Sequence, residues 1–102
     1  MIYVLARVEV AAGRRDDFLA EYREVVPKVR SEEGCIEYGA AIDKPTGIAA
    51  QRVLGDNAVV IVEKWDSLEA LKAHLDAPHM NEYRQRVKEI VTSVSLQILE
   101  PV

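Results

Sequence analysis

The sequence is poor in the features that mark several large classes of protein. It has a single cysteine in 102 residues, Cys35, so an internal disulfide framework is excluded and a reducing compartment is indicated. No apolar run reaches the roughly 20 residues of a membrane helix. The N-terminal stretch is too short and too interrupted for a signal peptide. We therefore expect a cytoplasmic protein with no membrane association.

Motifs for common cofactors are missing as well. The chain contains no G-x-G-x-x-G after a predicted strand, no P-loop, no C-x-x-C and no H-E-x-x-H. Its five glycines and one cysteine are too few for hidden versions of such motifs. We therefore expect no nucleotide cofactor, no flavin and no metal, and predict a protein that works without a cofactor.

Charge and length narrow the possible partners. The net charge is −4, and acidic and basic residues alternate along the chain, so no Lys/Arg stripe is available to bind nucleic acid or an anionic membrane. A chain of 102 residues is expected to form a single domain over residues 1–102, burying roughly 60–65% of its unfolded surface. Self-association would add burial to such a small domain.

Hydrophobic periodicity predicts strands that alternate with helices. Residues 2–10 alternate as a strand does, and residues 14–33 carry apolar side chains three and four apart, as on one helix face. Pro27 is expected to kink or split that helix. The nearly continuous apolar run over 58–65 predicts a strand buried on both faces. The other expected elements are a strand over 35–43, a hairpin with a weak strand over 48–54, a helix from Asp66 or Ser67 interrupted by Pro78, and a strand over 94–99.

This order is β-α-β-(β)-β-α-β, which predicts an α+β fold of the ferredoxin-like, split βαβ type. Right-handed crossovers place both helical segments on one face of an antiparallel sheet. The other face remains uncovered, and it carries apolar side chains such as Tyr3 and Leu5. A second copy of the same sheet is the simplest cover for it. We therefore expect a homodimer.

Few side chains are candidates for chemistry. His74 lies between Leu71 and Leu75 of an apolar helix stripe and is either a half-buried structural histidine or a proton carrier. His79 follows the helix break, where a structural role is favoured. The two histidines are five residues apart and would not share one helix face, so a metal pair is not expected.

Three further residues have two interpretations each. Trp65, the only tryptophan, is either a core residue or one wall of an aromatic pocket. Glu63 is either a solvated or interface carboxylate or a base with a raised pKa. Arg7, in the middle of a strand, either pairs with a carboxylate such as Glu9 or faces a ligand. Cys35 is expected to be a small buried hydrophobic side chain.

Three segments resemble the antibiotic biosynthesis monooxygenase family. They are Glu33–Tyr38 after the first helix, Val62–Leu75 with the string EKWDSLEALKAHL, and Ala77–Met80. Within that family the chain is most similar to the small members that resemble quinol monooxygenases. The resemblance covers nearly the whole chain, and the spacing of Trp, His and Pro-His is specific for the family but not for a substrate.

The resemblance implies a dimeric α+β barrel with a pocket between each sheet and its helices. It also implies a monooxygenase that adds one oxygen atom of O₂ to an aromatic quinol or anthrone without metal or flavin. Such chemistry needs a dry cavity, a proton acceptor and donors for an oxyanion. Trp65 would orient the ring and His74 would move the proton, as the family string implies. Arg7 and Tyr38 are our own candidates for steadying the anion.

Two alternatives remain. One is a non-catalytic dimeric module of the same fold that binds ligands or is associated with stress. The other is a haem-degrading monooxygenase, which the family resemblance disfavours. That branch uses an Asn on the first strand and a late helical His ligand, and the corresponding positions here hold Arg7 and Tyr83. That branch also uses a Trp, and Trp65 is the only one of the three positions that matches it.

Overall fold

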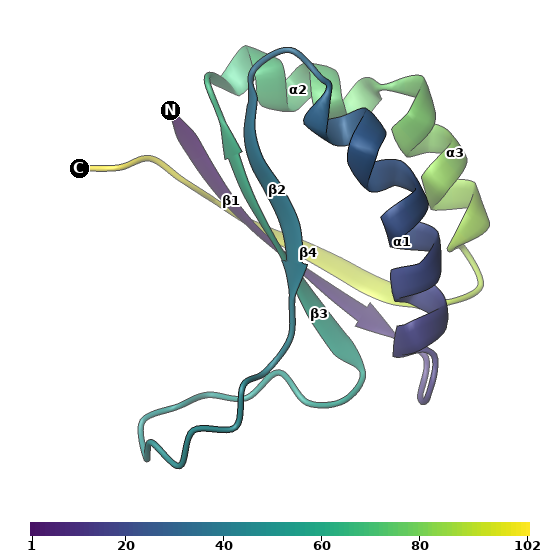
Figure 1. Cartoon of the computed structure of the whole chain (residues 1–102), viewed down its shortest axis with the longest axis vertical. Coiled ribbons are helices and arrows are strands. Elements are labelled where there is room, and N and C mark those ends of the chain that lie inside the picture. Colours follow the sequence, from purple (N-terminus) through teal and green to yellow (C-terminus); the bar gives the residue numbers. More distant parts are fainter.

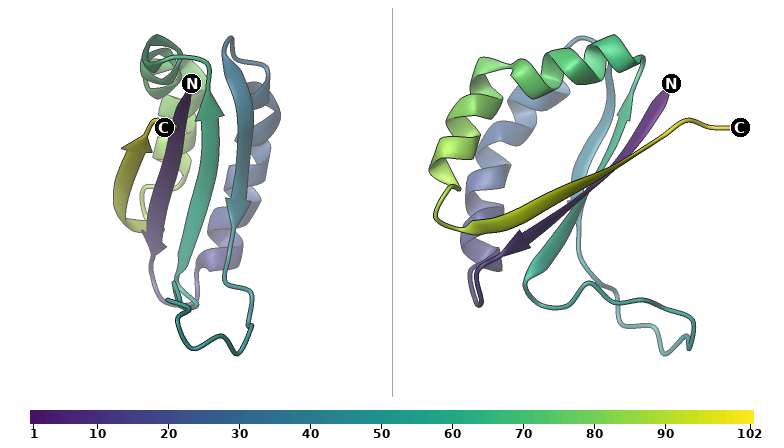
Figure 2. Two further views of the ribbon diagram at one scale, coloured as in Figure 1. Left: turned by 90° about the vertical axis from the view of Figure 1, so that its left-hand side faces the viewer. Right: turned by 180° about the vertical axis from the view of Figure 1, so that it is seen from behind.

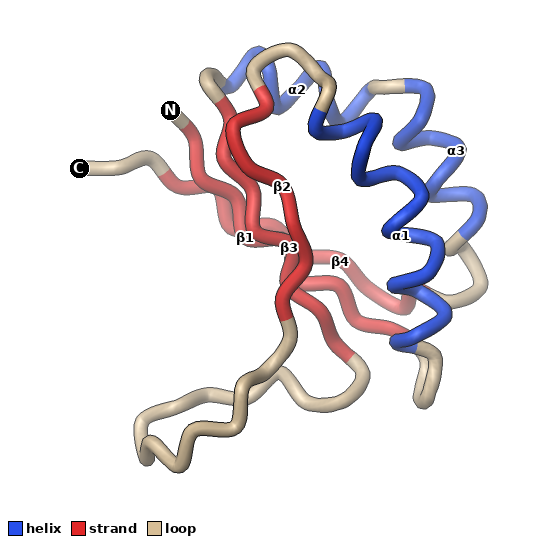
Figure 3. The backbone as a smooth tube through the Cα atoms, in the orientation of Figure 1, coloured by secondary structure: helices blue, strands red, loops and turns tan.

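The computed structural model describes all residues, 1–102, as one four-stranded antiparallel sheet with three helices. The strands lie in the order β2-β3-β1-β4, the ferredoxin-like order that the alternation of elements predicts. The helices all lie on one side of the sheet, and the other side has no cover (Figures 1 and 3). The elements in chain order are β1 Ile2–Val10, α1 Arg15–Arg30, β2 Cys35–Ala41, β3 Ala58–Trp65, α2 Leu68–Asp76, α3 Pro78–Arg86 and β4 Val91–Leu99.

The core lies between the helices and the central strands. The buried side chains of α1 follow the predicted spacing: Phe18, Tyr22, Val25 and Val29. They pack against the alternate residues of β1 and β3 that face the same side, which are also buried. Pro27 lies within α1 without splitting it, because the helix continues to Arg30. Of the two expected effects of this proline, a kink or a split, the split is therefore wrong.

The second helical segment is divided, as Pro78 predicts. α2 begins after Ser67, whose hydroxyl accepts a hydrogen bond from the Ala70 backbone N–H at 3.1 Å, so Ser67 is the N-cap. Ala77 is extended and ends α2, and Pro78 starts α3 in the first-turn position where its missing N–H costs nothing. No helix of the chain is long and apolar enough to cross a membrane.

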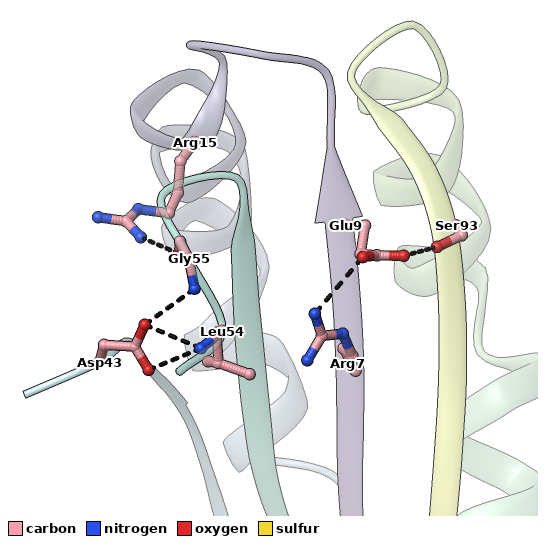
Figure 4. A network of polar contacts seen from close by, with 7 residues as sticks. All are labelled: Arg7, Glu9, Arg15, Asp43, Leu54, Gly55 and Ser93. Atoms are coloured by element: carbon pink, nitrogen blue, oxygen red, sulfur yellow. Dashed lines mark hydrogen bonds and ion pairs between the residues drawn. The ribbon is translucent and has the colours of Figure 1, made fainter. Parts of the chain in front are cut away.

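The connection between β2 and β3 contains no strand, so the expected hairpin over residues 44–57 is wrong. It projects from the sheet as an irregular arm (Figures 1 and 2). At its base, the Asp43 carboxylate accepts hydrogen bonds from the backbone N–H groups of Leu54 and Gly55 at 2.9 Å, and Arg15 donates to the Gly55 carbonyl at 3.2 Å (Figure 4). The hydrogen bonds from Leu54 and Gly55 lower the pKa of Asp43. Here side chains, in place of a partner strand, form hydrogen bonds with the backbone N–H and C=O groups.

The edge strand β4 is unusual because nearly all of it is exposed. Three apolar side chains of β4 point to the helix side of the sheet, since they pair with the buried β1 residues Val8, Ala6 and Val4. No helix covers them. They are Val94, Leu96 and Ile98, which are 57%, 42% and 49% exposed.

Candidate active site

A pocket of about 430 Å³ lies between the sheet and the second and third helices. Its walls are mostly apolar, with Ala6, Val8 and Ile61 from the sheet and Leu75, Met80 and Val87 from the helical side. The exposed side chains of Val94 and Leu96 form part of the wall on the β4 side. No residue of the 42–57 arm lines this pocket. The pocket therefore resembles a small-molecule site, apolar with few polar groups.

Four buried side chains of the wall carry polar groups: Glu63, His74, Tyr38 and Tyr83. Tyr83 comes from α3, and the other three form the candidate site. Each comes from a different element: Glu63 from β3, His74 from α2 and Tyr38 from β2. The rings of Tyr38 and His74 meet edge to face, with 5.5 Å between centroids. The fold thus brings a carboxylate, an imidazole and a phenol to one point on an apolar wall.

Glu63 is held by a neighbour on its own strand. The indole Nε1–H of Trp65 donates to Glu63 Oε1 at 2.9 Å. Burial raises the pKa of Glu63 to about 7, and the nearby Glu32 adds to the rise, while the bond from Trp65 opposes it. A carboxyl group with this pKa exchanges protons near neutral pH, as a general acid or base must.

His74 is held by a carboxylate from outside its helix. Its Nδ1 lies 2.9 Å from Glu32 Oε2, in the turn between α1 and β2. A carboxylate only accepts, so this contact assigns the proton of the neutral imidazole to Nδ1 and leaves Nε2 as an acceptor. Nε2 lies 4.0 Å from Glu63 Oε1, too far for a direct hydrogen bond. Burial lowers the pKa of His74, and the bond to Glu32 opposes that shift.

Glu32 also binds the second histidine. His79 Nε2 lies 2.7 Å from the same Oε2 atom of Glu32. The two histidines do not share a helix face, yet they converge on one carboxylate because Pro78 divides the helix between them. No group of three or more His, Cys, Asp or Glu side chains is arranged to hold a metal ion.

A glycine allows the turn that carries Glu32 to approach α2. Gly34 has φ +82°, and a Cβ at this position would lie 2.6 Å from the Cβ of Ala70. Its carbonyl accepts a hydrogen bond from the backbone N–H of Asp66 at 2.8 Å. Any larger residue would push the turn away from α2. Gly34 therefore sets the distance over which Glu32 reaches His74.

The four predicted site residues lie in different places. His74 and Tyr38 line the pocket. Trp65 is completely buried and does not line it; its indole lies beside His74, with 4.6 Å between ring centroids, and holds Glu63. Arg7 lies on the opposite face of the sheet, partly exposed, with Nη2 3.5 Å from Glu9 Oε1 (Figure 4). Of the two interpretations of Arg7, its contacts match the pairing with Glu9.

Sequence reasoning did not select Glu32, and it left Glu63 undecided. Glu63 shares the strand face of Trp65, so strand alternation gave a signal for its burial. Glu32 gave none, because it lies in a turn, 42 residues before His74 and 47 before His79. Its role depends on how the α1–β2 turn packs on the second and third helices.

Comparison with known proteins identifies the family of this chain. The family model described as "Antibiotic biosynthesis monooxygenase" matches residues 1–86. The chain is 35% identical over 103 aligned positions to an Escherichia coli strain K12 protein named "Probable quinol monooxygenase YgiN", covering 99% of this chain and 98% of that protein.

Solved structures show the same fold. Rv0793 from Mycobacterium tuberculosis superposes with a TM-score of 0.79 at 25% identity, covering 99% of this chain and 94% of that one. PA3566 from Pseudomonas aeruginosa gives a TM-score of 0.80 at 20% identity, covering 99% and 93%. The ferredoxin-like α+β fold and the predicted enzyme class, monooxygenase, are confirmed. The chain belongs to the antibiotic biosynthesis monooxygenase family.

Proposed function

We propose that this protein oxidises an aromatic quinol or anthrone with O₂ in the pocket between the sheet and the helices, with no metal or flavin. The observation that carries the proposal is the pair formed by Glu63 Oε1 and His74 Nε2, 4.0 Å apart in the wall of an apolar pocket. A substrate hydroxyl placed between these atoms would be within hydrogen-bond reach of both.

Glu63 is the proposed base. With a pKa of about 7, its carboxylate form is well populated at neutral pH and can take a proton from a phenolic hydroxyl. His74 Nε2 accepts or returns that proton, and Glu32 fixes the orientation of the imidazole. Trp65 acts as a positioning residue, because it holds Glu63 rather than touching the pocket.

Tyr38 is the proposed donor to the anion. Burial raises the pKa of its phenol above the ordinary range, so the hydroxyl keeps its proton and can donate to a quinolate oxygen. In a pocket with few polar groups, one such hydrogen bond stabilises a developing charge more than it would in water.

The reaction balances without a further reductant. Deprotonated quinol passes one electron to O₂, and the resulting semiquinone and superoxide combine through a new C–O bond and take up a proton. The hydroperoxide then loses water as its O–O bond breaks. One oxygen atom remains on the ring and the other leaves as water, so that a hydroquinone and O₂ give a hydroxyquinone and H₂O.

The test is oxygen uptake by metal-stripped protein with a panel of quinols and anthrones. We expect uptake above the rate of spontaneous autoxidation, one O₂ per quinol, and one labelled oxygen in the product when ¹⁸O₂ is used. Glu63→Gln, which keeps the side-chain shape, is the matched control and is expected to return the rate to background. Saturable quinone binding with no enzymatic uptake would instead favour the non-catalytic ligand-binding module.

We also propose that the protein is a homodimer, forming the dimeric α+β barrel. The sheet face without helices carries Leu5 and Val62, paired across β1 and β3, together with Tyr3 and Val60; all four are only half-buried. At the sheet edge, β4 also leaves Leu96 and Ile98 exposed on the helix side. A second copy would cover this apolar area and close the pocket on the β4 side. Sedimentation at micromolar concentration tests this, and a well-folded monomer would overturn it.

A further inference from the structure

Two cations without ionic partners stand at the pocket. Arg84 and Lys88 both line it, and both are exposed at the end of α3 and just after it. Lys88 lies two residues beyond the end of α3, and both side chains line the same pocket. The only side-chain hydrogen bond of Arg84 runs from Nη1 to Asn81 Oδ1 at 3.0 Å, and neither residue forms an ion pair.

Some other cations of the chain form ion pairs with carboxylates, whereas Arg84 and Lys88 do not. Arg86, two residues from Arg84 on the same helix, donates to Glu21 Oε2 at 2.9 Å and does not line the pocket. Arg14 donates to Asp17. Arg84 and Lys88 are the only arginine and lysine in the wall of this apolar pocket, in an acidic protein of net charge −4.

The charge of Arg84 reaches the polar groups inside the pocket. It contributes to lowering the pKa of His74, after burial as the main cause, and it opposes the rise that burial causes in the pKa of Tyr83. The only carboxylate in the pocket wall is Glu63, which is buried beside His74. An anionic group near Arg84 and Lys88 would thus meet two positive charges, with no carboxylate paired to either.

We infer that the substrate is an anionic quinol, in which a carboxylate or similar group bound by Arg84 and Lys88 accompanies an aromatic ring whose hydroxyl lies between Glu63 and His74. This inference rests on the proposed function and names its substrate class. Guanidinium and ammonium groups bind carboxylates through charge-assisted hydrogen bonds, which are the stronger kind. The apolar wall between the two polar ends accommodates the ring.

Binding can be measured without turnover. Trp65 is the only tryptophan and lies directly behind Glu63 and His74, so its fluorescence reports a quinone in the pocket by quenching. The probes are a 1,4-naphthoquinone with a short carboxyalkyl chain and the matching primary amide, which differ in charge at nearly equal size. We expect the carboxylate to bind about tenfold tighter to the unaltered protein at low salt, with the preference shrinking as salt screens the charges.

Two variants sharpen this measurement. The double variant Arg84→Gln, Lys88→Gln is expected to bind both probes equally, whereas Arg86→Gln, which removes a paired cation outside the pocket, is expected to keep the preference. Equal binding of both probes to the unaltered protein would overturn the inference. So would a preference that survives in the double variant, or no quenching by either probe.

Oxygen uptake with the two corresponding quinols separates this inference from the proposed function. Uptake with no preference for the anionic quinol would overturn the substrate class and leave the monooxygenase proposal intact. A charge-dependent binding preference with no enzymatic uptake would overturn the monooxygenase proposal and leave the anion-binding role of Arg84 and Lys88 standing.

Discussion

Strands β3 and β4 flank β1 on either side, and both contribute to the pocket, yet their environments are opposite. The helix-side residues of β3 are all buried, whereas those of β4 are about half exposed or more. Both strands carry alternating apolar side chains, so composition does not explain the difference. The helices cover β3 and leave β4 open (Figure 2). The inner wall of the pocket, on the β3 side, is therefore part of the core of the single chain. The outer wall, on the β4 side, is exposed and would be covered by a second copy.

Among substitutions in the inner wall, a change at Glu63 is expected to lower the reaction rate the most. Glu63→Gln removes the proposed base while keeping an acceptor for the Trp65 indole, and general bases contribute about 10²–10⁴-fold to rates. We expect a loss of at least about 100-fold in kcat/KM, measured by oxygen uptake. The rate of the unaltered protein should fall as pH drops through about 7, because protonated Glu63 cannot act as a base. A variant that keeps both the rate and this pH dependence would remove Glu63 from the mechanism.

A substitution in the outer wall is expected to weaken association of the dimer. Leu96→Asp places a charge on the 42%-exposed side chain of β4 beside the pocket. If a second copy covers β4, burying an unpaired carboxylate there should weaken association by about 100-fold or more, visible by sedimentation across a concentration series. Gln85→Asp, on the exposed surface of α3, adds the same charge elsewhere and serves as the control. A dimer unaffected by Leu96→Asp would mean that β4 stays open.

Trp65→Phe tests the hydrogen bond from the Trp65 indole to Glu63. The indole bond favours the ionised form of Glu63, so its loss should raise the pKa of Glu63 further and move the pH dependence of the rate upward. We expect a decrease of about tenfold at pH 7 that narrows at higher pH. An equal loss at every pH would indicate that Trp65 acts only through packing.

The smallest expected effect is on stability. The pKa of Glu63 is raised in the folded protein, from 4.5 to about 7, so the folded state binds its proton more tightly than the unfolded state does. Glu63 therefore favours folding most below about pH 4.5, and this contribution is lost as pH rises through about 7. Glu63→Gln does not titrate and should be more stable than the unaltered protein at pH 8, by about 1–3 kcal/mol, with the difference vanishing near pH 4.5. Thermal unfolding at the two pH values measures this.

Local pattern was sufficient for most of the fold. The periodicity of α1, the strand at β3 and the break at Pro78 each lie within one segment, and each of these elements forms as expected. The expected burial of β3 on both faces is wrong for the single chain, because Val60 and Val62 on the face without helices are only half-buried. The segment over 48–54 is also apolar in part, but no strand forms there. Strand formation needs a partner edge, and this arm is held without one by hydrogen bonds that Asp43 accepts and that Arg15 donates.

The site was less predictable because its contacts join distant segments. Strand alternation placed Glu63 and Trp65 on one face, but it could not tell which of the two borders the pocket and which lies behind it. His74 was selected, whereas Glu32 was not, since nothing within its own turn distinguishes it from the neighbouring Glu33. Only the packing of the α1–β2 turn against the second and third helices makes that choice.

The interruption at Pro78 determines how the two histidines are placed relative to each other. In an unbroken helix, positions 74 and 79 would point about 140° apart, and a single oxygen atom could not serve both imidazoles. Because the chain bends at Pro78, His74 of α2 and His79 of α3 both contact Oε2 of Glu32. Pro78→Ala, which would favour a straight helix, should break one of the two contacts with Glu32 and reorient the His74 imidazole in the pocket wall, although Pro78 itself does not line the pocket.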